Sequence, residues 1–275
     1  MKVTLVLGGG GLKGLAHVGA WRAVLEAGIS VSEIIGTSIG ALVGACIAGG
    51  SPVAELERRA LALRRSDIVV LNRWALLLNG IRQPAVFRAE PFHAFIASVL
   101  PVERFEQFGL PCSMNAVDLE SGEELWFGAG GRRDVPVADA VYASSALPLF
   151  YPPGLIGQRR FADGGVADSL PLERARQRGA DRIIAIDVGA GPRKDALDTL
   201  AKGLVAIGHR VYDIMNYRRK RLLLDTWQGP ELMYVRPKLD GYSTFDFGST
   251  GYFLEEGYRA TAEALGLDTR RSAEA

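Results

Sequence analysis

Short apolar runs and helix-spaced apolar stripes alternate along the first fifty residues. The run Val3–Leu7 ends in four consecutive glycines, and the stretch 13–27 that follows carries apolar residues at helical spacing. A second short run at 33–35 leads into another stripe at 39–47, which a glycine pair terminates. The pattern therefore predicts two successive strand–turn–helix units.

The remainder of the chain continues this alternation. Residues 111–117 and 123–127 flank a turn signal and predict a β-hairpin. The other expected elements are a helix at 137–145, a turn-rich segment at 152–161, a helix at 171–178, a strand at 182–188, a long helix marked by the apolar stripe Leu197–Ile214, a strand at 232–235 and a helix at 251–265. Repeated strand–helix alternation predicts a three-layer α/β/α fold with a largely parallel central sheet. We expect one domain over residues 1–275, in which residues 52–108 form a variable cap or lid.

Composition and charge narrow the class of function. The 275 residues are 48% hydrophobic with a formal net charge of +1, which argues against disorder and gives no global field for binding nucleic acid. The two cysteines, Cys46 and Cys112, cannot build a disulfide framework. The three histidines form no cluster with them, so we expect no metal site and no cofactor.

No apolar stretch of the sequence approaches the roughly 20 residues that span a bilayer. The run Val3–Leu7 is too short for the apolar region of a signal peptide. Val43–Cys46 imitates a lipoprotein cleavage box, but it lies too far from the start and follows no signal peptide. We therefore expect a cytoplasmic protein, with peripheral contact at the inner membrane face as a candidate property.

Gly9, Gly11 and Gly14 match the pattern G-x-G-x-x-G between a strand and a helix. A dinucleotide-binding loop of this type needs an acidic residue after the second strand, where the sequence has Gly36-Thr37-Ser38. No Gly-Lys-Ser/Thr follows, which argues against a Walker loop. A glycine loop before a helix also presents backbone N–H groups to developing negative charge, as an oxyanion hole does. A plain tight turn is the remaining alternative.

Gly36-Thr37-Ser38-Ile39-Gly40 matches G-x-S-x-G, again between a predicted strand and a predicted helix. In that context the serine lies on a sharp turn with its hydroxyl exposed at the sheet edge. The N–H of Ile39 would then point toward the space beside the glycine loop. The alternative is that Ser38 only caps the following helix.

The sequence offers no convincing histidine as the base for Ser38. His209 lies off the apolar stripe of its helix, so we expect a solvated surface side chain. His17 is expected to be packed or half-exposed, and His93 lies in the irregular region. Asp163-Gly164-Gly165 is the better partner, although an acid followed by two glycines also suits a β-turn.

These ordered motifs resemble the patatin-like phospholipase family. The resemblance extends to the block 143–148, Ala-Ser-Ser-Ala-Leu-Pro, and covers about residues 1–190. It implies a patatin-like fold and a serine acyl hydrolase with a Ser–Asp dyad, in which Ser38 is the nucleophile and Asp163 the general base. The implied oxyanion residues are Gly9, Gly10, Gly11 and Ile39, and the other motif residues are Lys13, Gly14, Gly36, Gly40, Gly164 and Gly165. Asp168 departs from the uncharged residue common after Asp-Gly-Gly.

The leading hypothesis is hydrolysis of carboxylic esters of lipids, with a lipid or other ester as substrate. The alternative is a catalytically idle lipid-binding or regulatory protein on the same fold. The apolar segment Asp67–Ile81 is a candidate acyl-chain entrance or membrane-touching lid, with ordinary core packing as the alternative. Arg218–Arg221 is a candidate contact with anionic lipid, or a solvated helix end. The natural lipid stays open. So does the oligomeric state, because the apolar stripe Leu197–Ile214 suits the core, which we expect, or a partner face.

Overall fold

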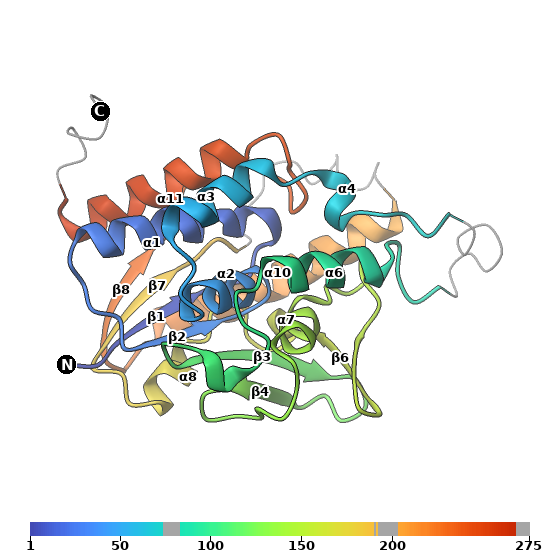
Figure 1. Ribbon diagram of the computed structural model, residues 1–275, viewed down its shortest axis with the longest axis horizontal. Coiled ribbons are helices and arrows are strands. Elements are labelled where there is room, and N and C mark those ends of the chain that lie inside the picture. The colour runs from blue at the N-terminus through green and yellow to red at the C-terminus, as the bar shows by residue number, and fades with distance from the viewer. Residues whose placement is uncertain (74–82, 190, 192–202, 268–275) are drawn as a thin grey trace.

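The computed structural model describes residues 1–73, 83–189, 191 and 203–267 (Figure 1). The strands are β1 (Val3–Leu7), β2 (Glu33–Gly36), β3 (Cys112–Asp118), β4 (Glu124–Gly128), β5 (Gly154–Ile156), β6 (Arg159–Asp163), β7 (Arg182–Ile186) and β8 (Glu231–Val235). The α-helices are α1 (Ala16–Glu26), α2 (Ile39–Ala48), α3 (Val53–Ala62), α4 (Arg65–Ile68), α6 (Ala89–Val99), α7 (Val137–Ser145), α8 (Leu172–Gln177), α10 (Leu204–Asp225) and α11 (Thr250–Leu265). Short 3-10 turns are η1 (Gly11–Leu15), η3 (Phe105–Gln107) and η4 (Gly164–Val166).

The described strands form one eight-stranded mixed sheet. Strands β3, β2, β1, β7 and β8 run parallel in that order. Strands β4 and β6 both pair antiparallel with β3, and β5 pairs antiparallel with β6. The predicted largely parallel sheet is therefore confirmed at its centre, whereas the expectation of turns alone at 152–161 is wrong, because the hairpin β5–β6 begins there.

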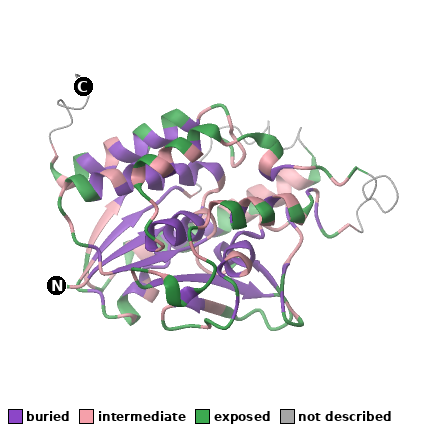
Figure 2. Cartoon of the chain, in the orientation of Figure 1, coloured by how far each residue is buried: buried purple, intermediate pink, exposed green. Residues whose placement is uncertain are grey.

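Helices cover both faces of this sheet, as the three-layer prediction requires. On one face Leu5, Leu7 and Ile34 lie in the larger apolar core with α1, α2, α7 and α11. On the opposite face Val6 and Ile35 belong to a smaller core with α8 and the end of α10. Neighbouring residues of one strand point to opposite faces, so the continuous apolar runs follow from burial on both sides. Figure 2 shows the central strands buried and the outer sides of the covering helices exposed.

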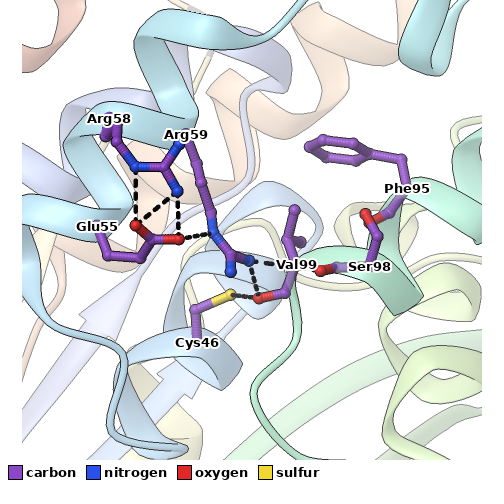
Figure 3. A network of polar contacts seen from close by, with 7 residues as sticks. All are labelled: Cys46, Glu55, Arg58, Arg59, Phe95, Ser98 and Val99. Carbon is purple, nitrogen blue, oxygen red and sulfur yellow. Dashed lines mark hydrogen bonds and ion pairs between the residues drawn. The ribbon is translucent and has the colours of Figure 1, made fainter.

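Polar contacts connect helices α3 and α6, which belong to the region 52–108, to each other and to α2 (Figure 3). Arg59 on α3 donates a hydrogen bond of 2.9 Å to the carbonyl of Val99 at the end of α6, and it pairs with Glu55. The thiol of Cys46 on α2 lies 3.6 Å from the same carbonyl. Side chains from α2 and α3 therefore meet at one carbonyl at the end of α6. The predicted lid Asp67–Ile81 is described only as far as residue 73, and its remainder lies outside the described residues.

The long helix α10 packs with its polar side inward. We expected its apolar stripe to favour the core, but Leu204 is 79% exposed and Val211 51% exposed. The buried positions are Asn216 and Lys220, and the Lys220 ammonium lies 2.6 Å from the carboxylate of Asp187. A spacing of three and four predicts a helix but not which of its faces is buried. The stripe residues Leu197 and Leu200 lie outside the described residues.

Candidate active site

The two glycine-rich turns lie at the same edge of the sheet. Strands β1 and β2 are parallel neighbours, with Leu7 opposite Gly36, so the segments that follow them emerge side by side. The N–H of Thr37 donates a hydrogen bond of 3.1 Å to the carbonyl of Leu7, which ties the serine turn to the end of β1. This edge, at the carboxyl ends of parallel strands, is where ligands bind in open α/β sheets.

Ser38 lies on a strained turn between β2 and α2. Its φ of 57° and ψ of −123° are unusual for a non-glycine residue. A Cβ at Gly36 would lie 2.3 Å from the carbonyl oxygen of Gly40, and a Cβ at Gly40 would lie 2.0 Å from that of Leu7. Both glycines are therefore required by close backbone approach. The N–H of Ser38 donates to the Ser144 hydroxyl at 3.0 Å, which holds the turn from α7.

Asp163 reaches Ser38 from the antiparallel part of the sheet. It is the last residue of β6, paired with Ala116 of β3, and its side chain is buried. Its Oδ2 accepts a hydrogen bond of 2.6 Å from Ser38 Oγ, and its Oδ1 accepts one of 2.7 Å from the Gly165 N–H. Burial raises the pKa of Asp163 to about 6, although the hydrogen bonds from Ser38, Gly165 and Tyr212 act in the opposite direction.

The glycine loop offers fewer N–H donors than we expected. The amide of Gly9 donates to the Ser169 carbonyl at 2.9 Å, so Gly9 is not available as an oxyanion donor in this structure. Within the described ranges, the amides of Gly10, Gly11 and Ile39 have no acceptor. Ile39 is also the first residue of α2, so the positive end of that helix lies at the same place. Three of the four predicted donors therefore stay candidates.

The remaining motif residues lie around these groups. Gly14 packs against Ile39, which brings the glycine loop and α2 together. Lys13 is buried and lines the cavity beside Ser38. Gly164 lies against the buried amide of Asn115 on β3. The structure therefore brings the predicted motif residues to one edge of the sheet.

Asn115 is a polar contact that the sequence analysis missed. Its Oδ1 accepts a hydrogen bond of 2.9 Å from Thr37 Oγ1, and its Nδ2 donates to the carbonyls of Gly164 and Asp168 at 3.1 and 3.0 Å. It thereby joins the residue before Ser38 to the residue after Asp163. A lone asparagine in a predicted strand carries no motif, so no sequence signal pointed to it.

Asp168, the departure from the family pattern, is half-buried and folds back onto its own loop. Its Oδ1 accepts the N–H of Leu170 at 3.0 Å, and burial raises its pKa to about 6.

A cavity with both apolar and polar walls opens beside Ser38 and Asp163. The apolar lining consists of Leu12, Ile39, Leu42, Ile68, Phe92, Leu147, Tyr151 and Phe245. The other polar side chains of the lining are Lys13, Ser145, Ser169, His209, Tyr212, Asp213, Asn216 and Thr244. Such a site can hold an apolar chain while it presents a nucleophile and hydrogen-bond donors to a polar centre.

His209 is not the solvated surface residue that we expected. Its side chain is only 16% exposed, its Nε2 lies 2.7 Å from the Thr244 hydroxyl, and its ring packs edge-on against Phe150. It lines the cavity, but its hydrogen bond goes to Thr244 and not to Asp163.

The other two histidines lie away from the proposed reaction. His17 is buried, with Nε2 2.8 Å from the Gly8 carbonyl, and burial lowers its pKa to about 4. His93 pairs with Asp139 on α7. In the described part of the chain, no group of three or more His, Cys, Asp or Glu side chains is placed to hold a metal ion.

Comparison with known proteins finds relatives that match most of this chain. An uncharacterized NTE family protein of Mycobacterium tuberculosis is 33% identical over 198 residues, which cover 71% of this chain and 52% of that protein. Patatin-like phospholipase domain-containing protein 6 of Mus musculus is 28% identical over 98% of this chain and 21% of its own length. Lysophospholipase nte1 of Aspergillus fumigatus is 30% identical over 93% of this chain and 18% of its own length. The chain thus spans about half the length of the mycobacterial protein and about a fifth of the length of the other two.

A solved structure shares the fold. The crystal structure of VipD from Legionella pneumophila superposes with a TM-score of 0.52 at 14% identity, over 96% of this chain and 66% of that one. The family model described as Patatin-like phospholipase matches residues 5–176, which include both glycine-rich turns and Asp163. On this match the chain belongs to the patatin-like phospholipase family.

Proposed function

We propose that this protein hydrolyses carboxylic esters of lipids, with Ser38 as nucleophile and Asp163 as its general base. The single observation that carries the proposal is the hydrogen bond of 2.6 Å from Ser38 Oγ to Asp163 Oδ2. A pKa of about 6 leaves Asp163 mostly ionised at neutral pH, yet a better base than an ordinary carboxylate. Membership of the family and the name of the fungal lysophospholipase support lipids as the substrate class.

The reaction proceeds in two halves. Ser38 Oγ attacks the ester carbonyl carbon while its proton moves to Asp163 Oδ2, and the carbonyl oxygen becomes an oxyanion. The free amides of Gly10, Gly11 and Ile39 donate to that oxygen. As the intermediate collapses, Asp163 returns the proton to the departing alcohol. A water molecule then attacks the acyl-enzyme and gives a proton to Asp163, which passes it to Ser38 Oγ as the acyl–oxygen bond breaks and the carboxylic acid leaves.

The apolar side chains of the cavity suit the acyl chain. Ile68, Phe92 and Phe245 are among its lining residues and carry no charge. The competing proposal is a catalytically idle lipid-binding or regulatory protein. The hydrogen-bonded pair Ser38–Asp163 and the unpaired amides favour the enzyme, because passive binding requires neither.

We also propose that the protein contacts membrane surfaces peripherally, and that residues 52–108 act as a cap over the cavity. Ile68 of α4 already lines the cavity, which supports the cap. Among the described helices, none has both the length and the apolar composition needed to cross a bilayer. The exposed side chains of Leu204, Val211 and Met215 on α10 support contact with a lipid surface.

The test of the proposed function compares wild type, Ser38→Ala and Ser66→Ala. Ser66 is an exposed serine of α4 and serves as the matched control. Wild type and Ser66→Ala should react with a serine-directed fluorophosphonate and hydrolyse esters in a panel of phospholipids, lysophospholipids, acylglycerols and short-chain esters. Ser38→Ala should neither react with the fluorophosphonate nor hydrolyse these esters. Its circular dichroism spectrum should match that of wild type, which shows that the fold is kept. Hydrolysis by Ser38→Ala at the wild-type rate would contradict the proposal.

A further inference from the structure

The carboxylate of Asp163 has a third polar neighbour, which comes from a distant part of the chain. The hydroxyl of Tyr212, on α10, lies 3.4 Å from Asp163 Oδ1. A Cβ at Gly165 would lie 2.3 Å from this same hydroxyl. The second glycine of Asp163-Gly164-Gly165 therefore leaves the space into which the tyrosine reaches.

Contacts along α10 hold Tyr212 in this place. Two turns further on, the buried ammonium of Lys220 pairs with Asp187 at 2.6 Å, which binds the helix to the end of β7. The guanidinium of Arg219 donates to the carbonyl of Val166 at 2.8 Å, directly after the Asp163 loop. The helix α10 is thus connected both to the segment that follows β7 and to η4, which follows Asp163.

The Tyr212 hydroxyl acts as a hydrogen-bond donor throughout the working pH range. Loss of solvent around it and the nearby charge of Asp163 raise the pKa of Tyr212 well above its ordinary value. A protonated phenol beside a carboxylate donates its hydrogen to the carboxylate, which is the stronger acceptor when ionised.

We propose that Tyr212 is a positioning residue for the hydrolysis proposed above. Its hydroxyl donates to Oδ1 of Asp163, which keeps Oδ2 turned toward Ser38 and favours the ionised carboxylate. The separation of 3.4 Å is longer than a usual O–H···O hydrogen bond, so the contribution lies at the lower end of the range for charged partners. This inference rests on the proposed function, because it concerns the same carboxylate.

Other titratable groups line the same cavity or the adjoining loop and remain in place when Tyr212 is changed. They are Lys13 from the glycine loop, Asp168 from the loop after η4, and His209, Asp213 and Arg219 from α10. Substitution of Tyr212 by phenylalanine removes only the hydroxyl and leaves these charges unchanged.

The deciding measurement is the titration of Asp163 itself. Carboxyl ¹³C NMR of aspartate-labelled protein gives its pKa, and Asp163→Asn identifies the signal. Tyr212→Phe should raise this pKa by about 0.5–1 unit, because the ionised form loses a donor. Tyr217→Phe, which removes a hydroxyl five residues further along α10, should leave it unchanged. An Asp163 pKa unchanged or lowered in folded Tyr212→Phe would overturn the proposal.

The rate profile provides a second readout that a purely structural role would not give. For a soluble short-chain ester, the acid limb of kcat/KM should move to higher pH in Tyr212→Phe. The rate should fall about two- to fivefold at pH 6 and stay within about threefold of wild type at pH 8. An equal loss at every pH would contradict positioning. Because the NMR titration needs no turnover, absence of ester hydrolysis would refute the proposed function and leave the Tyr212 contact open to its own test.

Discussion

Asp163 carries a charge in a place that disfavours it. Its pKa of about 6 exceeds the ordinary aspartate value of about 3.9, so ionisation is less favourable in the folded protein than in the unfolded chain. The resulting free-energy penalty on folding is complete above pH 6 and disappears below about pH 4. The raised pKa that makes Asp163 a better base in the proposed mechanism therefore also reduces the stability of the fold.

Asp163→Asn should stabilise the protein while it removes nearly all activity. We expect the free energy of unfolding to rise by about 1–3 kcal/mol at pH 7–8, because the amide carries no charge. The gain should shrink as the pH falls from 6 to 4, where wild-type Asp163 becomes protonated. Urea denaturation of both proteins at pH 4.5 and pH 8 measures the difference. A gain that grows toward low pH would contradict the raised pKa.

The variant His209→Asn tests whether catalysis uses the Ser38–Asp163 dyad or a triad that includes His209. His209 bonds to Thr244, whose carbonyl accepts the N–H of Leu12 in the glycine loop, so its loss should disturb the loop and not the proton transfer. We expect kcat/KM to fall by about tenfold or less and the acid limb of the profile to stay in place. A folded variant that loses ~10³-fold or more, the scale of triad members, would restore a histidine mechanism.

The sequence allowed prediction of the residues that lie in short local motifs. Ser38 lies between Gly36 and Gly40, and Asp163 is followed by Gly164 and Gly165, so the neighbours of each residue point to it. Tyr212 and Asn115 have no such flanks, because distant segments bring them to the site. The amide of Gly9 was misjudged for a related reason, since its acceptor Ser169 lies far along the chain.

At the scale of elements, the buried charges of α10 determine how the helix packs. Burial alone would raise the pKa of Asp187, but Lys220 and Arg236 hold it below its ordinary value. Burial lowers the pKa of Lys220, which the nearby Asp187 opposes. The pair is hydrogen-bonded and almost free of solvent, so neither partner can be removed alone without leaving a buried charge.

Lys220→Met should destabilise the fold by about 3–5 kcal/mol, the usual cost of breaking a buried ion pair from one side. The double variant Lys220→Met/Asp187→Leu should recover part of this loss, because the buried carboxylate that has lost its ammonium is then absent, while Arg236 keeps its pair with Asp240. Thermal unfolding of wild type, both single variants and the double variant measures the coupling. Losses that simply add would show that the pair does not hold α10.

Strands and helices with strong patterns were predictable from the sequence, and weakly patterned ones were not. Strands β1, β2 and β7 are buried on both faces, so they appear as continuous apolar runs. The hairpin β5–β6 was taken for turns, since its strands have only three and five residues and two prolines precede them. The apolar stripe that predicts α10 stops at Ile214, whereas the helix continues to Asp225 through four consecutive basic residues.

At the scale of the whole molecule, one exposed apolar stripe lies on the helix that also borders the active site. Leu204, Val211, Met215 and Leu222 are spaced by four or seven residues, and all are more than half exposed. Arg218 and Arg221 lie on the exposed side of the same helix. Apolar residues flanked by arginines are typical of a helix that rests on an anionic lipid surface.

Val211→Ser/Met215→Ser should weaken sedimentation with vesicles of mixed phosphatidylglycerol and phosphatidylcholine by about tenfold. Turnover of a soluble short-chain ester should stay at the wild-type level, since neither side chain lines the cavity. Leu61→Ser, at another exposed leucine, is the control. Vesicle binding equal to wild type, or a change of oligomeric state in the double variant, would contradict the assignment to lipid.

The pairing of β6 with β3 also determines when the protein becomes reactive. Ser38 and Asp163 lie 125 residues apart, and Asp163 reaches Ser38 only through the antiparallel pairing of Ala116 with Asp163. At ribosomal rates this separation amounts to a delay on the order of ten seconds. During that interval the emerging chain already carries both glycine-rich turns but has no base beside the serine. With the proposed dyad built in this order, the chain stays chemically silent until most of its sheet has been made.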